Sequence, residues 1–361
     1  MKRSIKYICL LIAAVMILSL SSCAVNRGTP VMTLGEVYVT DHMFEYWMDS
    51  YKAALLSAYP DAKDTESFWN MKLASGSTAE DFFYDSIYNY IESRLVAMYL
   101  FDEFGLEIEK EDVATAEEIV SELEEYYSGG NRNDFNRELA VYGVNAELLK
   151  EIFLEEVKST YLYNYIFENS LLTVGDDEKN EYLRDNYSRI RQIYINDEYD
   201  PEASYYDSNG YFVMVPLSDE AKAEKTAKTG EARALLAAGE DFDKVYSEYS
   251  EETAYPNGYY LSVSTQGLPN ELITNAFLID AGETADFRSD YGTHIIKRLE
   301  MDDGAYANDA NKDFFGTFTA EVYEAVYNKY IATYYDKITV DKSAIEKYTV
   351  RSAPANYYFK Y

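Results

Sequence analysis

Apolar residues in the N-terminal half of the chain recur three and four positions apart, the spacing that gathers them on one face of a helix. Asp41 is placed to cap the first such helix. Gly105 follows a predicted helix over about 79–104, and Gly143 follows a short one near 135–142, as glycines commonly do at helix ends. The pattern predicts helices over about 41–55, 79–104, 110–127, 135–142 and 145–161, and a further helix from about 176.

The pattern changes in the central part of the chain, from about residue 189 to residue 300. Short apolar segments alternate there with turns, and two strands are predicted at 191–195 and 291–297. Helical spacing returns over about 309–335, ahead of a tyrosine-rich tail at 355–361. This order predicts an α+β protein whose strands lie mainly in its central part.

The first residues read as a targeting segment. Three basic residues precede an apolar run over 8–20, which is too short to span a bilayer and has the flanks of a signal peptide. The run ends in Leu-Ser-Ser-Cys, which resembles a bacterial lipobox and implies lipidation of Cys23. We therefore expect a signal peptide over 1–22, a lipidated tether over 23–35, and an extracytoplasmic protein anchored to the cell membrane. The alternative is a secreted protein with a chance cysteine.

Composition narrows the class of partner. The net charge of −32 repels nucleic acid and anionic lipid headgroups and favours basic partners. With two histidines, and with no cysteine besides Cys9 and Cys23, a catalytic Cys–His pair and most zinc sites are excluded. We expect neither a metal nor a cofactor. The 38 tyrosines argue against a disordered acidic chain. Most of them are expected between helices, and a minority on a surface that holds unfolded polypeptide.

Residues 231–300 resemble the catalytic domain of parvulins, the peptidyl-prolyl cis/trans isomerases. The segment 291–297, Tyr-Gly-Thr-His-Ile-Ile-Lys, is similar to the family's Gly-x-His-Ile-Ile strand, and Gly-Glu-Asp-Phe at 239–242 is similar to a family turn. The resemblance implies a small antiparallel sheet flanked by helices and catalysis of X–Pro isomerisation. Amide resonance gives that rotation a barrier of roughly 18–20 kcal/mol. A catalyst needs an apolar pocket for the proline ring and polar groups beside the amide.

The resemblance implies three catalytic positions. His294 matches the second histidine of the family, Gln192 stands where the family has its first, and Glu252 replaces a cysteine or aspartate. The amide of Gln192 can donate and accept hydrogen bonds, but it cannot reproduce the tautomers of histidine. The alternatives are that His294 is a buried histidine that holds a loop, and that Glu252 is a solvated loop residue.

The resemblance also implies a substrate-binding pocket. Leu261, Leu268 and Leu272 match its apolar positions, and Tyr291 is expected to narrow the site. The segment 257–262, Asn-Gly-Tyr-Tyr-Leu-Ser, lacks two glycines and an aspartate of the family pattern. The alternative is that the three leucines are core residues of a small domain.

The order of helices around this segment resembles the PrsA-like and SurA-like foldases, which combine a helical chaperone module with an inserted parvulin domain. The resemblance implies an α+β fold with an all-helical SurA-like module over 36–188 and a parvulin-like domain over 189–300. It also implies a C-terminal segment over 301–361 whose helix packs back on the helical module.

We therefore expect a membrane-anchored, extracytoplasmic foldase that chaperones unfolded or newly secreted proteins and isomerises X–Pro bonds, with catalysis weakened by Gln192 and the lost glycines. One alternative is a chaperone with a degenerate isomerase domain. A second is a lipid-anchored solute-binding or surface-interaction protein, a class that usually shows two lobes of alternating strands and helices. The sequence leaves a homodimer and the identity of the client open.

Overall fold

The computed structural model describes residues 26–58, 62–73 and 76–359. They divide into two units: a helical unit, made of the residues up to 173 and those from 327, and a sheet unit over 174–326. The helical unit is therefore built from both ends of the chain, and the sheet unit from its middle. The predicted signal peptide and Cys23 lie outside the described residues.

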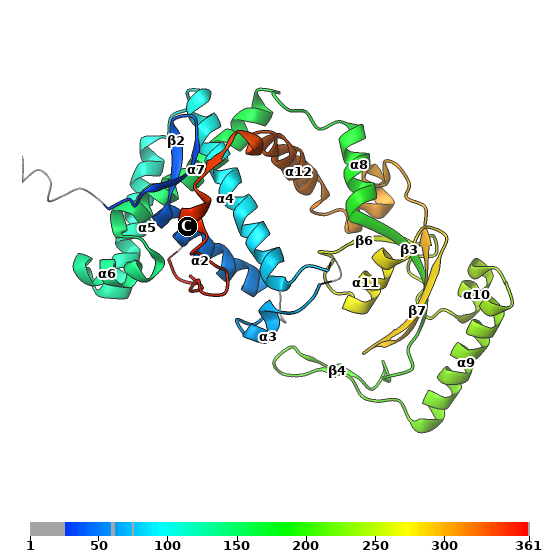
Figure 1. Cartoon of the computed structure of the whole chain (residues 1–361). Helices are drawn as coiled ribbons and strands as arrows, with labels where there is room; N and C mark the ends of the chain where they lie inside the picture. The colour runs from blue at the N-terminus through cyan, green and yellow to red at the C-terminus, as the bar shows by residue number, and fades with distance from the viewer. Residues whose placement is uncertain (1–25, 59–61, 74–75, 360–361) are drawn as a thin grey trace, which may run out of the picture. The chain divides into compact units, whose positions relative to one another are not determined.

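The helical unit has a core of long helices (Figure 1). In it, α4 packs against α2 and α7, and α5 packs against α7. Its elements before residue 174 are β1 (Pro30–Leu34), β2 (Val37–Thr40), α2 (Asp41–Ala58), α3 (Glu66–Trp69), α4 (Ala79–Glu103), α5 (Lys110–Ser128), α6 (Arg132–Leu139), η2 (Ala140–Tyr142) and α7 (Ala146–Glu168). The elements after residue 332 are η5 (Tyr335–Lys337), β9 (Thr339–Val340) and α13 (Lys342–Ile345).

Local sequence explains why α4 forms where it does. Thr78 and Asp81 make a capping box, in which each side chain accepts a hydrogen bond of 3.0 Å from the backbone N–H of the other residue. The helix buries the apolar face expected from the sequence, including Phe83, Ile87 and Leu95. Burial of that face supplies most of the stability of such a helix.

Part of the predicted tether is a strand. Residues 30–34 form β1, the central strand of a three-stranded antiparallel sheet with the order β2-β1-β9. Val31, Met32 and Leu34 are buried against the helical core, and this burial holds the segment in place. The expectation of a tether over 23–35 is wrong for residues 30–34.

The tyrosine-rich tail is part of the core of the helical unit. The ring of Phe359 lies 4.7 Å from that of Tyr127, 5.8 Å from that of Phe135 and 5.7 Å from that of Tyr142. Asn356 is buried, and its side-chain oxygen accepts the backbone N–H of Phe359 at 2.9 Å. The end of the described chain is therefore fixed by aromatic packing and by a hydrogen-bonded turn.

The sheet unit contains a four-stranded antiparallel sheet with the order β6-β3-β8-β7. Helices α9 and α10 cover one face of it, and α11 covers the other (Figure 1). Its elements are α8 (Asp176–Asn186), β3 (Tyr187–Ile195), β4 (Tyr205–Tyr206), β5 (Phe212–Val213), α9 (Asp219–Ala237), α10 (Phe242–Tyr249), β6 (Tyr259–Ser262), α11 (Asn270–Leu278), β7 (Thr284–Ser289), β8 (Gly292–Leu299), η3 (Ala305–Ala307) and η4 (Asp309–Phe314). The predicted α+β fold, with a small antiparallel sheet flanked by helices, is confirmed.

The alternation along β3 and β8 assigns each residue to one face of the sheet. Ile193 and Ile295 pack against α9 and α10, whereas Ile190 and Ile296 pack on the α11 side. Because side chains alternate along a strand, Gln192 shares the α11 side with Ile190, and His294 shares it with Ile296. The sheet thus places the two predicted catalytic positions on the same face.

The helix predicted over 309–335 is interrupted. Residues 309–314 form the short helix η4, and α12 begins only at Phe318 and ends at Ala332. Gly316 lies in the break, where the absence of a side chain lowers the helical preference. The boundary between the two units falls within α12.

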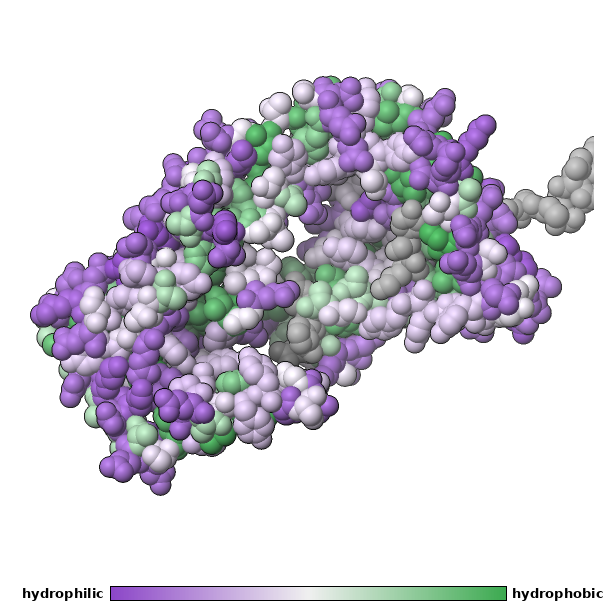
Figure 2. All heavy atoms as spheres, turned by 180° about the vertical axis from the view of Figure 1, so that it is seen from behind, coloured by the Kyte–Doolittle hydropathy of each residue, from purple (hydrophilic) through white to green (hydrophobic). Residues whose placement is uncertain are grey.

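The surface reflects the acidic composition. Figure 2 shows hydrophilic residues over most of the visible face, with smaller groups of hydrophobic residues between them. In the described part of the chain, no helix is both long and apolar enough to cross a membrane.

Candidate functional site

The sheet brings Gln192 and His294 together. Gln192 lies opposite Ile296 in the ladder and His294 lies opposite Tyr194, so the two side chains are diagonal neighbours on one face. Gln192 Oε1 is 3.1 Å from His294 Nδ1, and His294 Nε2 is 2.8 Å from Ser289 Oγ. Gln192 is 7% exposed and His294 is 3% exposed. The three side chains form a buried line of hydrogen bonds across β3, β8 and β7.

The partners of His294 define its protonation. Because a glutamine oxygen only accepts hydrogen bonds, Nδ1 donates to it and Nε2 accepts from the Ser289 hydroxyl. Burial lowers the pKa of His294 to about 4, and Asp197 opposes this shift. The ring also stacks on Phe287, with centroids 5.1 Å apart and planes 7° apart. His294 is therefore a neutral, orienting residue at pH 7.

Glu252 lies in the loop after α10, where it is partly buried rather than solvated. Its Oε1 accepts the backbone N–H groups of Ala254 at 2.6 Å and Tyr255 at 3.1 Å. Its Oε2 is buried without a hydrogen-bond partner among the described residues, as are the hydroxyls of Tyr246 and Tyr259. Burial, and then the negative charge of Glu252, raises the pKa of both tyrosines. One carboxylate oxygen is thus fixed by the loop, and the other is left without a partner.

Ser250 connects this loop to β3. Its Oγ lies 3.2 Å from the carbonyl oxygen of Gln192 and 3.0 Å from that of Glu252, and it accepts the backbone N–H of Tyr194 at 3.2 Å. The backbone N–H of Glu251 also donates to the carbonyl of Tyr194, at 2.7 Å. The loop that carries Glu252 is therefore held against the strand that carries Gln192.

The three predicted pocket leucines are in unequal surroundings. Leu261 is 0% exposed and Leu272 is 1% exposed, and both pack in the core between the sheet and α11. Leu268 is only partly buried and lies at the edge of the same cluster. Leu261 on β6 and Leu272 on α11 are core residues with almost no surface for a proline ring, since the helix packs on the sheet at this point. Only Leu268 has side-chain surface left to offer.

The connection after β3 begins at an ion pair between buried Asp197 and exposed Arg288 that the sequence did not reveal. Asp197 is buried, and its carboxylate accepts bonds from Arg288 Nη1 at 2.7 Å and Nη2 at 3.0 Å and from Thr293 Oγ1 at 2.9 Å. Tyr291 stands nearby, 42% exposed, with its carbonyl accepting the Tyr194 hydroxyl at 2.7 Å. These contacts fix the start of the connection, which continues through the β4–β5 hairpin.

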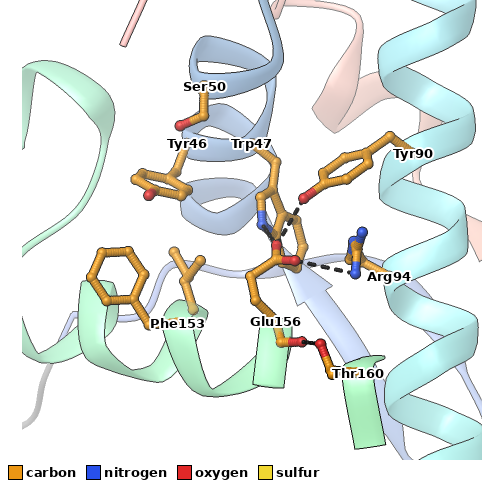
Figure 3. A pocket seen from close by; sticks show the side chains of 9 residues that line it. Tyr46, Trp47, Ser50, Tyr90, Arg94, Phe153, Glu156 and Thr160 are labelled. Atoms are coloured by element: carbon orange, nitrogen blue, oxygen red, sulfur yellow. Dashed lines mark hydrogen bonds and ion pairs between the residues drawn. The ribbon is translucent and has the colours of Figure 1, made fainter. Parts of the chain in front are cut away.

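The helical unit has a cavity of about 320 Å³ with aromatic walls (Figure 3). Glu156 lies at its centre, where its Oε1 accepts bonds from Trp47 Nε1 at 3.2 Å and from the Tyr90 hydroxyl at 2.8 Å. Its Oε2 pairs with Arg94 Nη1 at 3.1 Å. The cavity is lined by Tyr46, Trp47, Ser50, Tyr90, Arg94, Ile152, Phe153, Glu156 and Thr160.

This cavity combines apolar walls with a fixed ion pair. The Arg94 guanidinium lies 4.6 Å from the centroid of the Tyr90 ring, a cation–π contact that orients both side chains. Arg94 Nε is buried without a hydrogen-bond partner among the described residues. The site can accept an apolar side chain on its aromatic wall and offers a hydrogen-bond donor beside it.

Among the described residues, no group of three or more histidine, cysteine, aspartate or glutamate side chains is arranged to hold a metal ion.

No family model and no curated protein matches the sequence. Solved structures similar to this chain include PrsA of Bacillus subtilis, with 17% identity over 79% of this chain and 93% of that one and a TM-score of 0.24. PrsA of Bacillus anthracis has 16% identity over 73% and 96% of the two chains, with a TM-score of 0.24. A SurA-like chaperone of Campylobacter jejuni has 9% identity over 87% and 99%, with a TM-score of 0.25.

We predict that His294 makes folding depend on pH below about 6.5. In the unfolded chain the imidazole takes up a proton near its ordinary pKa, whereas in the folded chain it does so only near pH 4. Its contribution is thus complete above pH 6.5 and is lost as the pH falls towards 4, by up to about 3 kcal/mol. The free energy of unfolding, measured by urea titration from pH 7 to pH 4, should fall less steeply for His294→Gln than for the wild type. Parallel curves would show that His294 protonates as easily in the folded state.

Proposed function

We propose that the protein is an extracytoplasmic, membrane-anchored foldase for secreted proteins. Its helical unit holds unfolded polypeptide, and its sheet unit accelerates X–Pro isomerisation weakly. The observation that carries the proposal is the buried line of hydrogen bonds through Gln192, His294 and Ser289, next to a loop that leaves one oxygen of Glu252 without a partner.

The proposed chemistry needs only positioned charge. A planar amide places partial negative charge on its carbonyl oxygen, and this resonance is what resists rotation. A carboxylate beside that oxygen disfavours the planar form relative to the twisted one, so the barrier falls. In this proposal Glu252 supplies the charge. The hydrogen bond between Gln192 and neutral His294 holds β3 and β8 in register. Leu268 contacts the proline ring.

The second candidate is a chaperone without isomerase activity. The burial of Leu261 and Leu272 favours it, because two of the three pocket side chains have almost no free surface. A solute-binding protein of two alternating lobes is not favoured. Among the described residues, one unit is mainly helical and the other has a single antiparallel four-stranded sheet beside a two-stranded hairpin.

The helical unit supports the holding function. Its cavity offers an aromatic wall to an apolar side chain of an unfolded client. The net charge of −32 keeps a protein with exposed apolar surface soluble and attracts basic segments of a client. The cavity is lined by residues of the helical unit alone, so holding there would persist even if catalysis were absent.

Removing the charge of Glu252 should slow catalysis. We expect the wild type to raise the rate of X–Pro isomerisation in a proline-containing peptide above the uncatalysed rate at high protein concentration. Glu252→Gln should reduce this increase by roughly tenfold to a hundredfold. Leu268→Ala should also reduce this increase in rate, and Gln192→His should maintain or raise it.

Glu248→Gln, which removes an exposed charge on α10, is the matched control and should have no effect on the rate. A wild-type rate equal to background would favour the second candidate.

The anchor is proposed to be a lipid on Cys23. Wild-type protein made in a bacterium that processes lipoproteins should sediment with membranes, and Cys23→Ala should release it into the soluble fraction. A single acyl chain binds membranes only marginally, so stable anchoring requires the multiply acylated cysteine. Equal sedimentation of the two proteins would rule out a lipid on this residue.

A further inference from the structure

Asp49 on α2 is an unusual carboxyl group. Its side chain is 0% exposed, and neither carboxylate oxygen has a hydrogen-bond partner among the described residues. A buried polar group without partners costs free energy. Asp49 lines a second cavity of the helical unit, of about 310 Å³, between α2 and the segment 347–354 near the C-terminus. The position of this group beside open space points to a ligand with hydrogen-bond donors.

A second carboxyl group lines the same cavity. Glu45 precedes Asp49 by four residues, so the two side chains lie on one face of α2. Burial raises the pKa of Glu45, and the nearby His42 and Lys347 oppose this shift. The cavity is lined by Glu45, Met48, Asp49, Lys347, Tyr348, Thr349, Ser352, Ala353 and Pro354. It therefore holds two acidic groups together with the cation Lys347 and with neutral polar and apolar side chains.

The two cations near this cavity already have partners. Lys52 Nζ donates to the carbonyl of Ala353 at 2.6 Å and pairs with Asp64 at 2.9 Å. Lys347 Nζ lies 3.8 Å from Asp41 Oδ2 and 4.6 Å from the ring centroid of Tyr348. The charged and titratable groups that face Asp49 are Glu45 and Lys52 on α2, Tyr142 on η2, and Lys347 and Tyr348 on the C-terminal segment.

The protonation of Asp49 gives the cavity a dependence on pH. Burial, and then the charge of Glu45, raises the pKa of Asp49 to about 8, while Lys52 opposes the shift. Without a ligand the group is therefore mostly a neutral acid near pH 7. A bound cation would stabilise the ionised form, so binding would release a proton to solvent.

We infer that this cavity binds the basic side chain of a polypeptide, with the cationic nitrogen at Asp49 and with Glu45 as the second acidic group. The inference deepens the proposed function, on which it rests, because it gives the client a preferred residue type. A lysine or arginine side chain offers several N–H donors for the two unpartnered oxygens and an alkyl stem for Met48, Ala353 and Pro354. Ca²⁺ is less suited, because it takes six to eight oxygen ligands and two carboxyl groups line this cavity.

The test uses small probes and the full mature chain. Nα-acetyl-lysine amide should bind in calorimetric or NMR titrations, and Nα-acetyl-norleucine amide, which lacks the ammonium group, should not. Binding of the lysine probe should tighten roughly tenfold from pH 6 to 7, about fivefold from pH 7 to 8, and little above pH 9, because Asp49 must lose its proton while the ammonium group keeps its own up to about pH 10.4. Titrations in two buffers of different ionisation enthalpy should reveal the released proton without any variant.

Variants locate the site. Asp49→Asn should abolish both the binding and its pH dependence, with its folding checked by circular dichroism. Glu346→Gln, an exposed acid next to Lys347 that does not line the cavity, is the matched control and should bind like the wild type. Equal binding of the lysine and norleucine probes, or lysine binding that does not change with pH, would overturn the inference. So would Ca²⁺ binding that depends on Asp49 and displaces the probe. If the chain binds the lysine probe but does not suppress client aggregation, the inference of a basic-side-chain site at Asp49 stands. The proposed foldase function is then refuted.

Discussion

The pairing of β1 with β9 is the constraint on which the rest of the structure depends. It joins Met32 to Val340 and Thr33 to Thr339, so a strand near the start of the described chain lies beside one near its end. The helical unit closes through this contact, and the whole sheet unit becomes an insertion. The same closure brings the C-terminal segment onto α2, where the backbone N–H of Asn356 donates to the carbonyl of Asp49 at 2.9 Å. The acidic cavity exists because the two ends of the chain meet there.

A second long-range pairing builds the candidate site in the sheet unit. The ladder between β3 and β8 brings together Gln192 and His294, which are 102 residues apart in the sequence. The hydrogen bonds between these side chains fix their orientation. They do not take part in proton exchange near pH 7, since burial keeps the histidine neutral there. The loop of Glu252 is attached to the same strand through Ser250. Any catalysis here depends on the position of a carboxylate and not on proton transfer by histidine.

Local patterns predicted much of the fold. The helix expected over about 79–104 is α4, Ala79–Glu103, because its spacing and its Gly105 terminator are features of neighbouring residues. The strand expected at 191–195 lies within β3, and the strand at 291–297 overlaps β8. Strand β1 was missed although it forms a hairpin with the neighbouring strand β2, because five residues after a predicted leader are too few to show an alternating pattern. Its second partner, β9, is about 300 residues away and leaves no local signal. The break at residues 315–317 was missed because apolar spacing continues across it.

The candidate site was predictable only where a motif fixes the register. The placement of Gln192 beside His294 follows from alternation in two paired strands. The burial of Leu261 and Leu272 depends on how α11 covers the sheet, which their spacing does not reveal. Likewise Trp47 and Tyr90 lie in the helices predicted over about 41–55 and 79–104, whereas the meeting of Arg94 with Glu156 depends on the packing of α4 against α7. Contacts between distant helices carry no signature in a single sequence.

The proposed holding function places unfolded polypeptide at the aromatic cavity of the helical unit. The test measures how well the chain suppresses aggregation of a chemically denatured secreted protein when a bulky side chain of the chain itself fills the cavity. Thr160, an exposed residue on the cavity rim, is replaced by tryptophan, and Thr115→Trp on the exposed face of α5 serves as the matched control. If the cavity holds the client, Thr160→Trp should need several times more protein for the same suppression, while Thr115→Trp should act like the wild type. Equal suppression by all three proteins would contradict it.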